Sequence, residues 1–140
     1  MLTRALFALS LICGMASAAA AEEAKVLALG LADHAVTEEE LEKGTPPPVP
    51  RFNTPAIAYV SAANLKTGDT VEVTLSNNEK SLLTNSETLA GDRATYLLQA
   101  GKRGVPAGGW PSEWTYFAKV KITRDGKTLI EQATDPIPFE

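Results

Sequence analysis

Hydrophobic and polar residues alternate along most of the chain after residue 55, which is the pattern of strands with one buried face. In the segment 70–76, Val71, Val73 and Leu75 share one parity, while threonine, glutamate and serine take the other. A continuously apolar segment at 25–32 favours a further strand that is covered on both faces. Strands are expected near residues 25–32, 55–63, 70–76, 81–89, 93–100, 113–124 and 127–134.

The segment between the first two expected strands has a different pattern. Thr37 and Glu40 have the S/T-x-x-E spacing of a capping box, which predicts one or two helical turns over residues 37–43, ended by Gly44. Four prolines in five positions follow, and they fix φ and remove backbone donors. We therefore expect a Pro-rich connector at residues 44–55 that crosses from one sheet, or one edge, to another.

The dipeptide Asp125-Gly126 predicts the turn of a hairpin between the last two strands. A two-residue turn would set Glu131 opposite the inward Val120, whereas a three-residue loop over 124–126 would set Ile130 there. Burying an unpaired glutamate is costly and burying isoleucine is favourable. The three-residue loop is therefore the prediction.

Seven short strands, turns at regular intervals and no long helical pattern predict one all-β domain. The expected fold is a seven-stranded antiparallel β-sandwich of the immunoglobulin or fibronectin type III kind. The run 65–73, with its Gly-Asp turn before an alternating strand, resembles the Ig-like modules of bacterial extracytoplasmic proteins. Gly109-Trp110-Pro111 before an aromatic strand, and Asp125-Gly126-Lys127 after it, are similar to the last hairpin of such modules. Because these motifs are turn chemistry, the resemblance implies a fold and no activity.

The N-terminus has the layout of a secretory signal peptide. A lone Arg4 precedes the apolar stretch 6–13, which leads into the small residues 16–21. The apolar stretch is too short to span a bilayer. We expect a signal peptide at residues 1–21, cleaved after Ala18 or Ala21.

Cleavage changes the composition of the chain that remains. Cys13 is not in a good lipobox, because Ile12 stands where a small residue is needed, so no lipid anchor is expected. The mature domain, residues 22–140, keeps neither cysteine nor methionine, and its net charge is −5, since the 13 basic residues lose Arg4 and the 17 acidic ones remain. No disulfide, no cysteine-based metal centre and no nucleic-acid partner are therefore expected. We expect a periplasmic protein with no membrane span in its mature chain.

Little in the sequence points to catalysis or to a cofactor. His34, the only histidine, follows Asp33 at the end of a strand. Three roles stay open for it: a metal ligand, a base oriented by a carboxylate, or a residue that only hydrogen-bonds its neighbours. No G-x-S-x-G motif supplies a nucleophile, and the acidic run 38–42 lacks the pattern of a calcium loop. The sequence therefore predicts no catalytic residues, no metal site and no cofactor.

The segment 101–112 is the feature most suggestive of binding, because its glycines and prolines form a long loop at one end of the expected sandwich. Two interpretations of Trp110 stay open: the ring anchors a partner, or it folds back and plugs the open end of the core. The candidate binding residues are Lys102, Arg103, Val105, Pro106 and Trp110.

The function expected from these observations is that of a non-enzymatic periplasmic Ig-like module. It would engage another periplasmic or envelope protein through the 101–112 loop or an exposed sheet edge. Pro136 and Pro138 in the C-terminal tail would help to block one edge. A protease-inhibitor-like module that presents the same loop is the alternative, and a small-ligand or metal carrier is a less favoured one.

Overall fold

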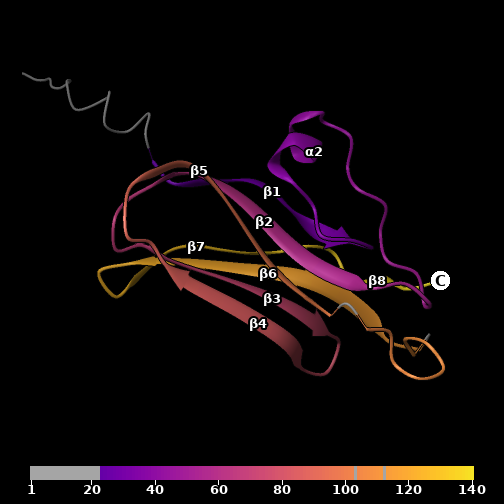
Figure 1. Ribbon diagram of the computed structural model, residues 1–140. Helices are drawn as coiled ribbons and strands as arrows, with labels where there is room; N and C mark the ends of the chain where they lie inside the picture. Colours follow the sequence, from indigo (N-terminus) through magenta and orange to yellow (C-terminus); the bar gives the residue numbers. More distant parts are fainter. Residues whose placement is uncertain (1–22, 103, 112) are drawn as a thin grey trace, which may run out of the picture.

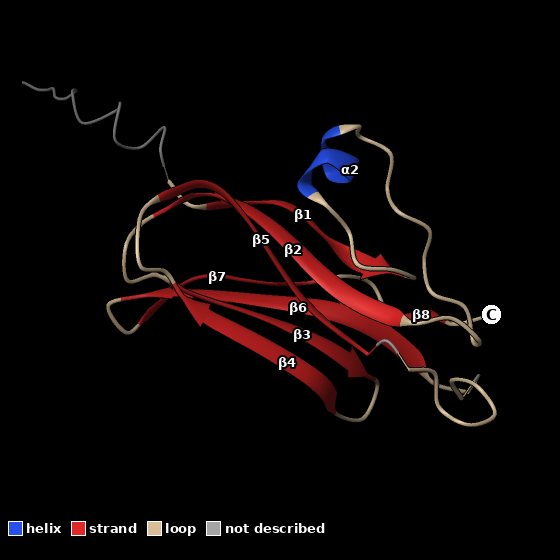
Figure 2. Ribbon diagram, viewed as in Figure 1, coloured by secondary structure: helices blue, strands red, loops and turns tan. Residues whose placement is uncertain are grey.

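The chain forms two antiparallel sheets packed face to face (Figure 1; Figure 2), as seen in a computed structural model that describes residues 23–102, 104–111 and 113–140. The first sheet has the order β1-β2-β5 and contains β1 (Lys25–Ala32), β2 (Ala56–Leu65) and β5 (Arg93–Lys102). The second has the order β4-β3-β6-β7 and contains β3 (Thr70–Asn77), β4 (Ser81–Thr88), β6 (Thr115–Arg124) and β7 (Lys127–Ala133). The expected signal peptide with Cys13, and Arg103 of the loop, lie outside the described residues.

The predicted all-β sandwich is confirmed, and each of the seven expected strands is present within two residues of its expected ends. The sequence missed a short further strand, β8 (Ile137–Pro138), which pairs with Tyr116 and Thr115 at the start of β6. A proline is tolerated there because β8 is an outer strand. In the described part of the chain, no helix is long and apolar enough to cross a membrane.

The core lies between the two sheets and follows the predicted alternation. The inward residues of β2, β3 and β6 have almost no exposed surface; they are Ala56, Ala58, Val60, Ala62, Val71, Val73, Leu75, Tyr116, Ala118, Val120 and Ile122. Trp114, which shares their parity, is only partly buried and lies just before β6. At the start of β6, the aromatic side chain that is fully buried in the core is therefore Tyr116 and not Trp114.

The predicted three-residue loop of the last hairpin is wrong. Arg124 pairs with Lys127, so the turn consists of Asp125 and Gly126 alone. Both have positive φ, 53° and 78°, which is the conformation of a type I′ turn.

A register shift in β7 explains how this turn avoids burying Glu131. Thr128 pairs with Thr123, but the next pair joins Ile130 to Ile122, which leaves Leu129 as an extra residue in a β-bulge. Ile130 therefore packs against the core, as its apolar side chain favours, and Glu131 stays exposed. The sequence analysis correctly placed Ile130 on the buried face, but a β-bulge and not a longer turn is what puts it there.

The predicted helix and connector are present, but the connector does not cross to the other sheet. The helix α2 (Glu38–Glu42) is capped by Thr37, whose hydroxyl accepts from the Glu40 amide at 3.1 Å, and Gly44 follows with a φ of 80°. The chain then returns to β2, the neighbour of β1 in the same sheet. Figure 1 shows α2 lying over the outer face of this sheet.

A second, smaller apolar cluster holds the segment between β1 and β2, which includes α2, against the first sheet. Val36 packs with Ala32 and Tyr59, and Leu41 of α2 joins them. The Tyr59 ring lies across Gly30, where a Cβ atom would come within 2.6 Å of the Tyr59 oxygen. The outer face of the β1-β2-β5 sheet is therefore partly covered.

At the sandwich end that carries the β6–β7 turn, the buried Asp69 forms an ion pair with the half-buried Arg124. The Asp69 side chain has no exposed surface; its carboxylate accepts from the Arg124 guanidinium at 2.7 and 2.8 Å and from the Lys66 amide at 2.8 Å. The hydrogen bonds from Arg124 are the main cause that holds the pKa of Asp69 below its usual value. This pair ties the β2–β3 turn to the end of β6.

Candidate functional site

The opposite end of the sandwich, which carries the long β5–β6 loop, is closed by three segments bonded to one another. The Trp110 amide donates to the Phe52 carbonyl at 2.8 Å, and its indole N–H donates to the Thr54 carbonyl at 2.8 Å. The Phe52 amide in turn donates to the Glu140 carbonyl at 3.2 Å. The connector, the loop and the C-terminal tail therefore form one hydrogen-bonded structure.

Three aromatic rings lie beneath this structure. Tyr116 and Phe139 are completely buried and stack with their centroids 4.0 Å apart. Trp110 packs edge-on against both rings, at 5.7 and 5.8 Å, and only 7% of its surface is exposed. Of the two interpretations of Trp110, the structure therefore shows the core plug, and the indole is not available as an anchor for a partner.

Three exposed apolar side chains lie on the segments that meet at this end. Val49 and Phe52 of the connector and Val105 of the loop are all exposed, and we call them the loop-end surface. The described residues contain two further exposed large hydrophobic side chains, Leu27 of β1 and Leu129 of β7, and each lies on a strand. Three of the five exposed large apolar side chains of the described residues therefore belong to the connector and the loop, which are bonded to each other at this end.

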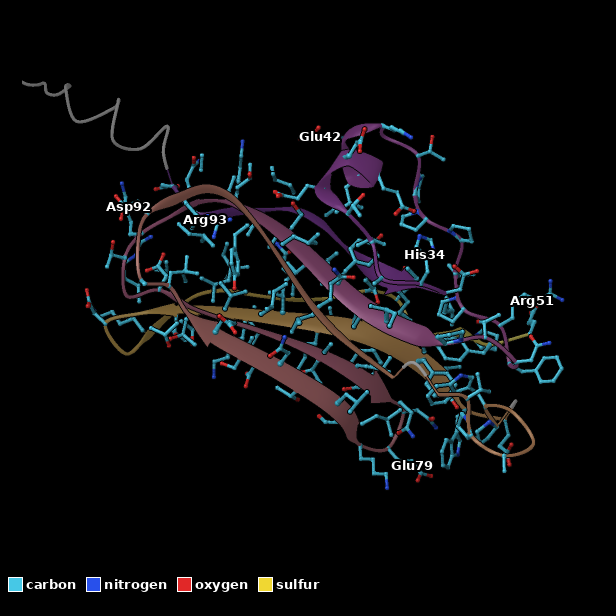
Figure 3. The ribbon with its side chains drawn as sticks, in the orientation of Figure 1. His34, Glu42, Arg51, Glu79, Asp92 and Arg93 are labelled. Carbon is cyan, nitrogen blue, oxygen red and sulfur yellow. The ribbon has the colours of Figure 1, made fainter. Side chains whose placement is uncertain are left out.

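The loop-end surface is held in place by the segments beneath it. Gly109 has a φ of 87°, and a Cβ atom on it would come within 2.8 Å of the Phe52 carbonyl oxygen, so only glycine allows this contact. Beside it lies a shallow hollow of about 510 Å³ lined by Val49, Pro50, Arg51, Ile137, Pro138 and Glu140. Figure 3 shows Arg51 projecting from this end of the molecule.

The predicted binding residues differ in how far they are exposed to solvent. Val105 is exposed, Pro106 is half-buried and Trp110 is buried. The side chain of Lys102 and all of Arg103 lie outside the described part. Sequence reasoning missed Val49 and Phe52, although large apolar residues in a Pro-rich segment without strand or helix periodicity were a usable signal.

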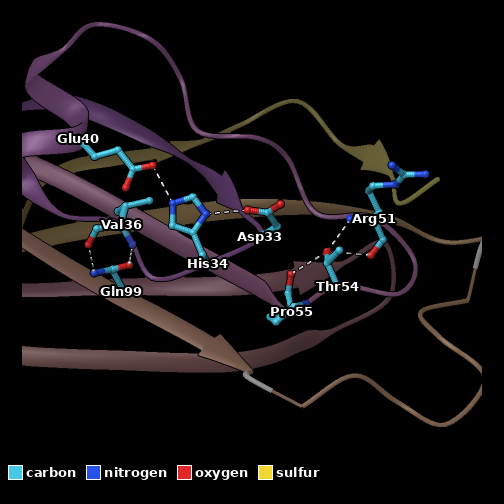
Figure 4. Close-up of polar contacts among 8 residues, drawn as sticks. All are labelled: Asp33, His34, Val36, Glu40, Arg51, Thr54, Pro55 and Gln99. Atoms are coloured by element: carbon cyan, nitrogen blue, oxygen red, sulfur yellow. Dashed lines mark hydrogen bonds and ion pairs between the residues drawn. The ribbon is translucent and has the colours of Figure 1, made fainter.

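His34 joins the end of β1 to α2 (Figure 4). Its Nδ1 lies 2.6 Å from Asp33 Oδ1 and its Nε2 lies 2.7 Å from Glu40 Oε2. The hydrogen bond with Asp33, and next the one with Glu40, raise the pKa of His34 above its usual 6.5. Nearby, the Gln99 side chain bonds the Val36 amide at 2.8 Å and the Val36 carbonyl at 2.9 Å. Within the described ranges, no group of three or more His, Cys, Asp or Glu side chains is placed to hold a metal ion.

Raising the pH is expected to loosen α2. Because the folded pKa of His34 lies above its unfolded value, the ion pairs stabilise the fold fully below about pH 6.5 and are lost as the pH rises through the folded pKa. The His34 side chain is 43% exposed, so the effect is expected to stay below about 1 kcal/mol. Hydrogen exchange of the α2 amides at mildly acidic and mildly alkaline pH, corrected for intrinsic rates, measures it. An unchanged pH dependence in His34→Gln would contradict this role.

Compared with known proteins, the chain matches no family model and no curated protein, so the fold and the loop-end surface are the features from which its function is inferred.

Proposed function

We propose that the protein is a non-enzymatic, immunoglobulin-like binding module of the periplasm, which holds another periplasmic or envelope protein at its loop-end surface. The periplasmic part of this proposal rests on the signal-peptide pattern of residues 1–21. The non-enzymatic part is supported by His34, since both of its ring nitrogens are bonded to carboxylates.

Two features of the sandwich support an immunoglobulin-like relationship. The fourth strand pairs with β3, so that β1, β2 and β5 face the strand order β4-β3-β6-β7, a plan that suits fibronectin type III modules. Tyr116, at the start of β6, donates its hydroxyl to the Pro111 carbonyl at 3.3 Å, which is the geometry of a tyrosine corner. Ala118, two residues later, takes the position of the disulfide cysteine in antibody domains.

The observation that carries the binding role is the position of the exposed apolar side chains. Val49, Phe52 and Val105 lie on loop segments, and the segments are fixed to the core by Trp110 and its hydrogen bonds. Binding through a preformed surface avoids much of the entropy cost of ordering flexible loops. Large apolar side chains at a rigid sandwich end are therefore well suited to protein recognition.

Affinity capture from periplasmic extract, with Phe52→Ser as the test variant, measures this role. We expect the native protein to retain a discrete partner and the Phe52→Ser variant to bind that partner at least about tenfold more weakly, as for a central apolar contact. Leu129→Ser is the matched control, because Leu129 is 41% exposed and Phe52 is 43% exposed, and Leu129 lies on β7 away from the loop. Thermal unfolding of both variants checks that they remain folded.

Two outcomes would contradict the proposal. In the first, capture of the partner is unaffected by Phe52→Ser. In the second, Leu129→Ser weakens capture as much as Phe52→Ser does, which would indicate general stickiness of exposed apolar residues.

A further inference from the structure

The segment that carries α2 is a loop whose two ends are bonded to each other. The Asp33 amide donates to the Pro48 carbonyl at 3.1 Å, which forms a neck between the end of β1 and the connector. This is the geometry of an Ω-loop, a compact surface loop with its ends close together. In Figure 1 the segment rises from the outer side of the first sheet, with α2 in its upper part. We call residues 33–48 the flap, and its neck allows it to move without disturbing β1 or β2.

The flap is held on the sheet by polar bonds and a small apolar contact. The Gln99 side chain of β5 accepts from the Val36 amide at 2.8 Å and donates to the Val36 carbonyl at 2.9 Å. Beside this bond, Val36 and Leu41 pack against Tyr59. A five-residue helix is not stable by itself, so α2 depends on these contacts and is expected to unwind when it leaves the sheet. Segments of this kind open locally, without unfolding of the whole domain.

His34 joins α2 to the neck of the flap only while it is protonated. Its two ring nitrogens bond the carboxylates of Asp33 and Glu40 (Figure 4). A neutral imidazole carries a single N–H, so it can donate to only one of them. Loss of the other proton therefore leaves one carboxylate facing a nitrogen lone pair, which repels it.

The other titratable groups around the flap do not replace this bond. Glu38 of α2 accepts from the uncharged Thr95 hydroxyl of β5 at 3.2 Å. Burial first, and then the charge of Glu40, raise the pKa of Tyr59 above its usual 10.0, so this phenol stays neutral. In the described part of the chain, neither carboxylate bonded to His34 forms an ion pair with a lysine or arginine. The charge that holds α2 to the neck is therefore that of His34.

We propose that residues 33–48 form a pH-controlled flap, which lies closed on the outer face of the first sheet while His34 is protonated and opens as one unit when His34 is neutral. Leu41 lines two hollows on this face, of about 160 and 310 Å³, and Leu27 and Ala28 of β1 line both of them. Removal of Leu41 from between them joins the hollows and uncovers the Tyr59 ring. The flap does not include the loop-end surface, so this proposal and the binding role are tested separately.

A single cysteine beneath the flap measures its opening. Ala32 is completely buried in the cluster under the flap, and Cys13 is the only cysteine in the sequence, so Ala32→Cys combined with Cys13→Ser carries one reporter thiol. Ala62→Cys is the matched control, because Ala62 is equally buried but lies between the two sheets. Iodoacetamide reacts with the thiolate of an exposed cysteine, and the ratio of the two rates largely removes the pH dependence of that reaction.

We expect the thiol at position 32 to react at least about tenfold faster than the thiol at position 62, because local opening costs less than global unfolding. Between about pH 6 and about pH 9, the ratio is expected to rise by up to about fivefold. His34→Gln should remove this rise. Gln99→Leu should increase the ratio at every pH, because it removes both bonds to Val36, whereas Gln132→Leu, at an exposed glutamine of β7, should leave it unchanged.

Amide hydrogen exchange of the native protein tests the same opening without a substitution in the sheet. The Val36 amide is bonded to the Gln99 side chain and the Leu41 amide to the Thr37 carbonyl. If the flap opens as one unit, both amides exchange with a common opening free energy, and the Asp33 amide in the neck stays more protected.

The proposal is overturned if the thiol at position 32 reacts no faster than the thiol at position 62, or if the ratio does not change with pH. It is also overturned if His34→Gln keeps the pH dependence. Unequal opening free energies for the Val36 and Leu41 amides would show that α2 frays by itself and that the flap does not open as a unit.

Discussion

Replacing Tyr116 by alanine is expected to lower the free energy of unfolding by about 4 kcal/mol, as for other large-to-small changes of a buried aromatic residue. Tyr116 is fully buried, stacks on Phe139 and supports Trp110, so its removal leaves a cavity under the segments that close the loop end. Urea denaturation followed by fluorescence measures the change.

Tyr116→Phe is the control for this prediction. It keeps the ring and loses only the hydroxyl bond to the Pro111 carbonyl, so we expect a loss of about 1 kcal/mol. Equal effects of the alanine and phenylalanine variants would show that the ring packing does not hold this end together. A loss below about 1 kcal/mol in the alanine variant would lead to the same conclusion.

Replacing Asp69 by alanine is expected to cost about 3 kcal/mol, because it leaves Arg124 and the Lys66 amide without their acceptor. Asp92→Ala is the matched control: its carboxylate accepts from the Thr67 amide and hydroxyl, but at an exposed position, so a clearly smaller loss is expected. Chemical denaturation of both variants makes the comparison. Similar losses in the two would contradict the special role of the buried pair.

The same ion pair predicts how stability responds to acid. The folded pKa of Asp69 lies below its usual value of 3.8, so the pair contributes its full stabilisation above that pH. The contribution is lost as the pH falls through the folded pKa. The difference in unfolding free energy between the native protein and Asp69→Asn should therefore shrink below about pH 4. A difference that stays constant down to pH 2 would contradict this explanation.

The strands were predictable because their signal is local. Val71, Val73 and Leu75 alternate with polar residues, and this period alone places them in the core. The last hairpin shows where local reasoning ends. Both a longer turn and a bulge bury Ile130, and the sequence does not distinguish them, because only the observed pairing shows that Leu129 is the extra residue.

The two closed ends of the sandwich were not predictable, because they join residues far apart in the chain. Asp69 and Arg124 each look like ordinary turn residues, and nothing in the sequence pairs them across 55 positions. The position of Trp110 likewise depends on Phe139, which lies in a tail that has no pattern of its own. Of the loop-end surface, the sequence analysis named only Val105, because Val49 and Phe52 belong to a connector far from the loop in the sequence.

Site-specific photo-crosslinking in the cells that express the protein tests the binding role most directly. A photoreactive amino acid at position 52 should form a discrete adduct with one partner protein, and the same amino acid at position 129 should form none, although both sites are similarly exposed. An adduct at position 129 with none at position 52 would show that the partner is held elsewhere on the sandwich.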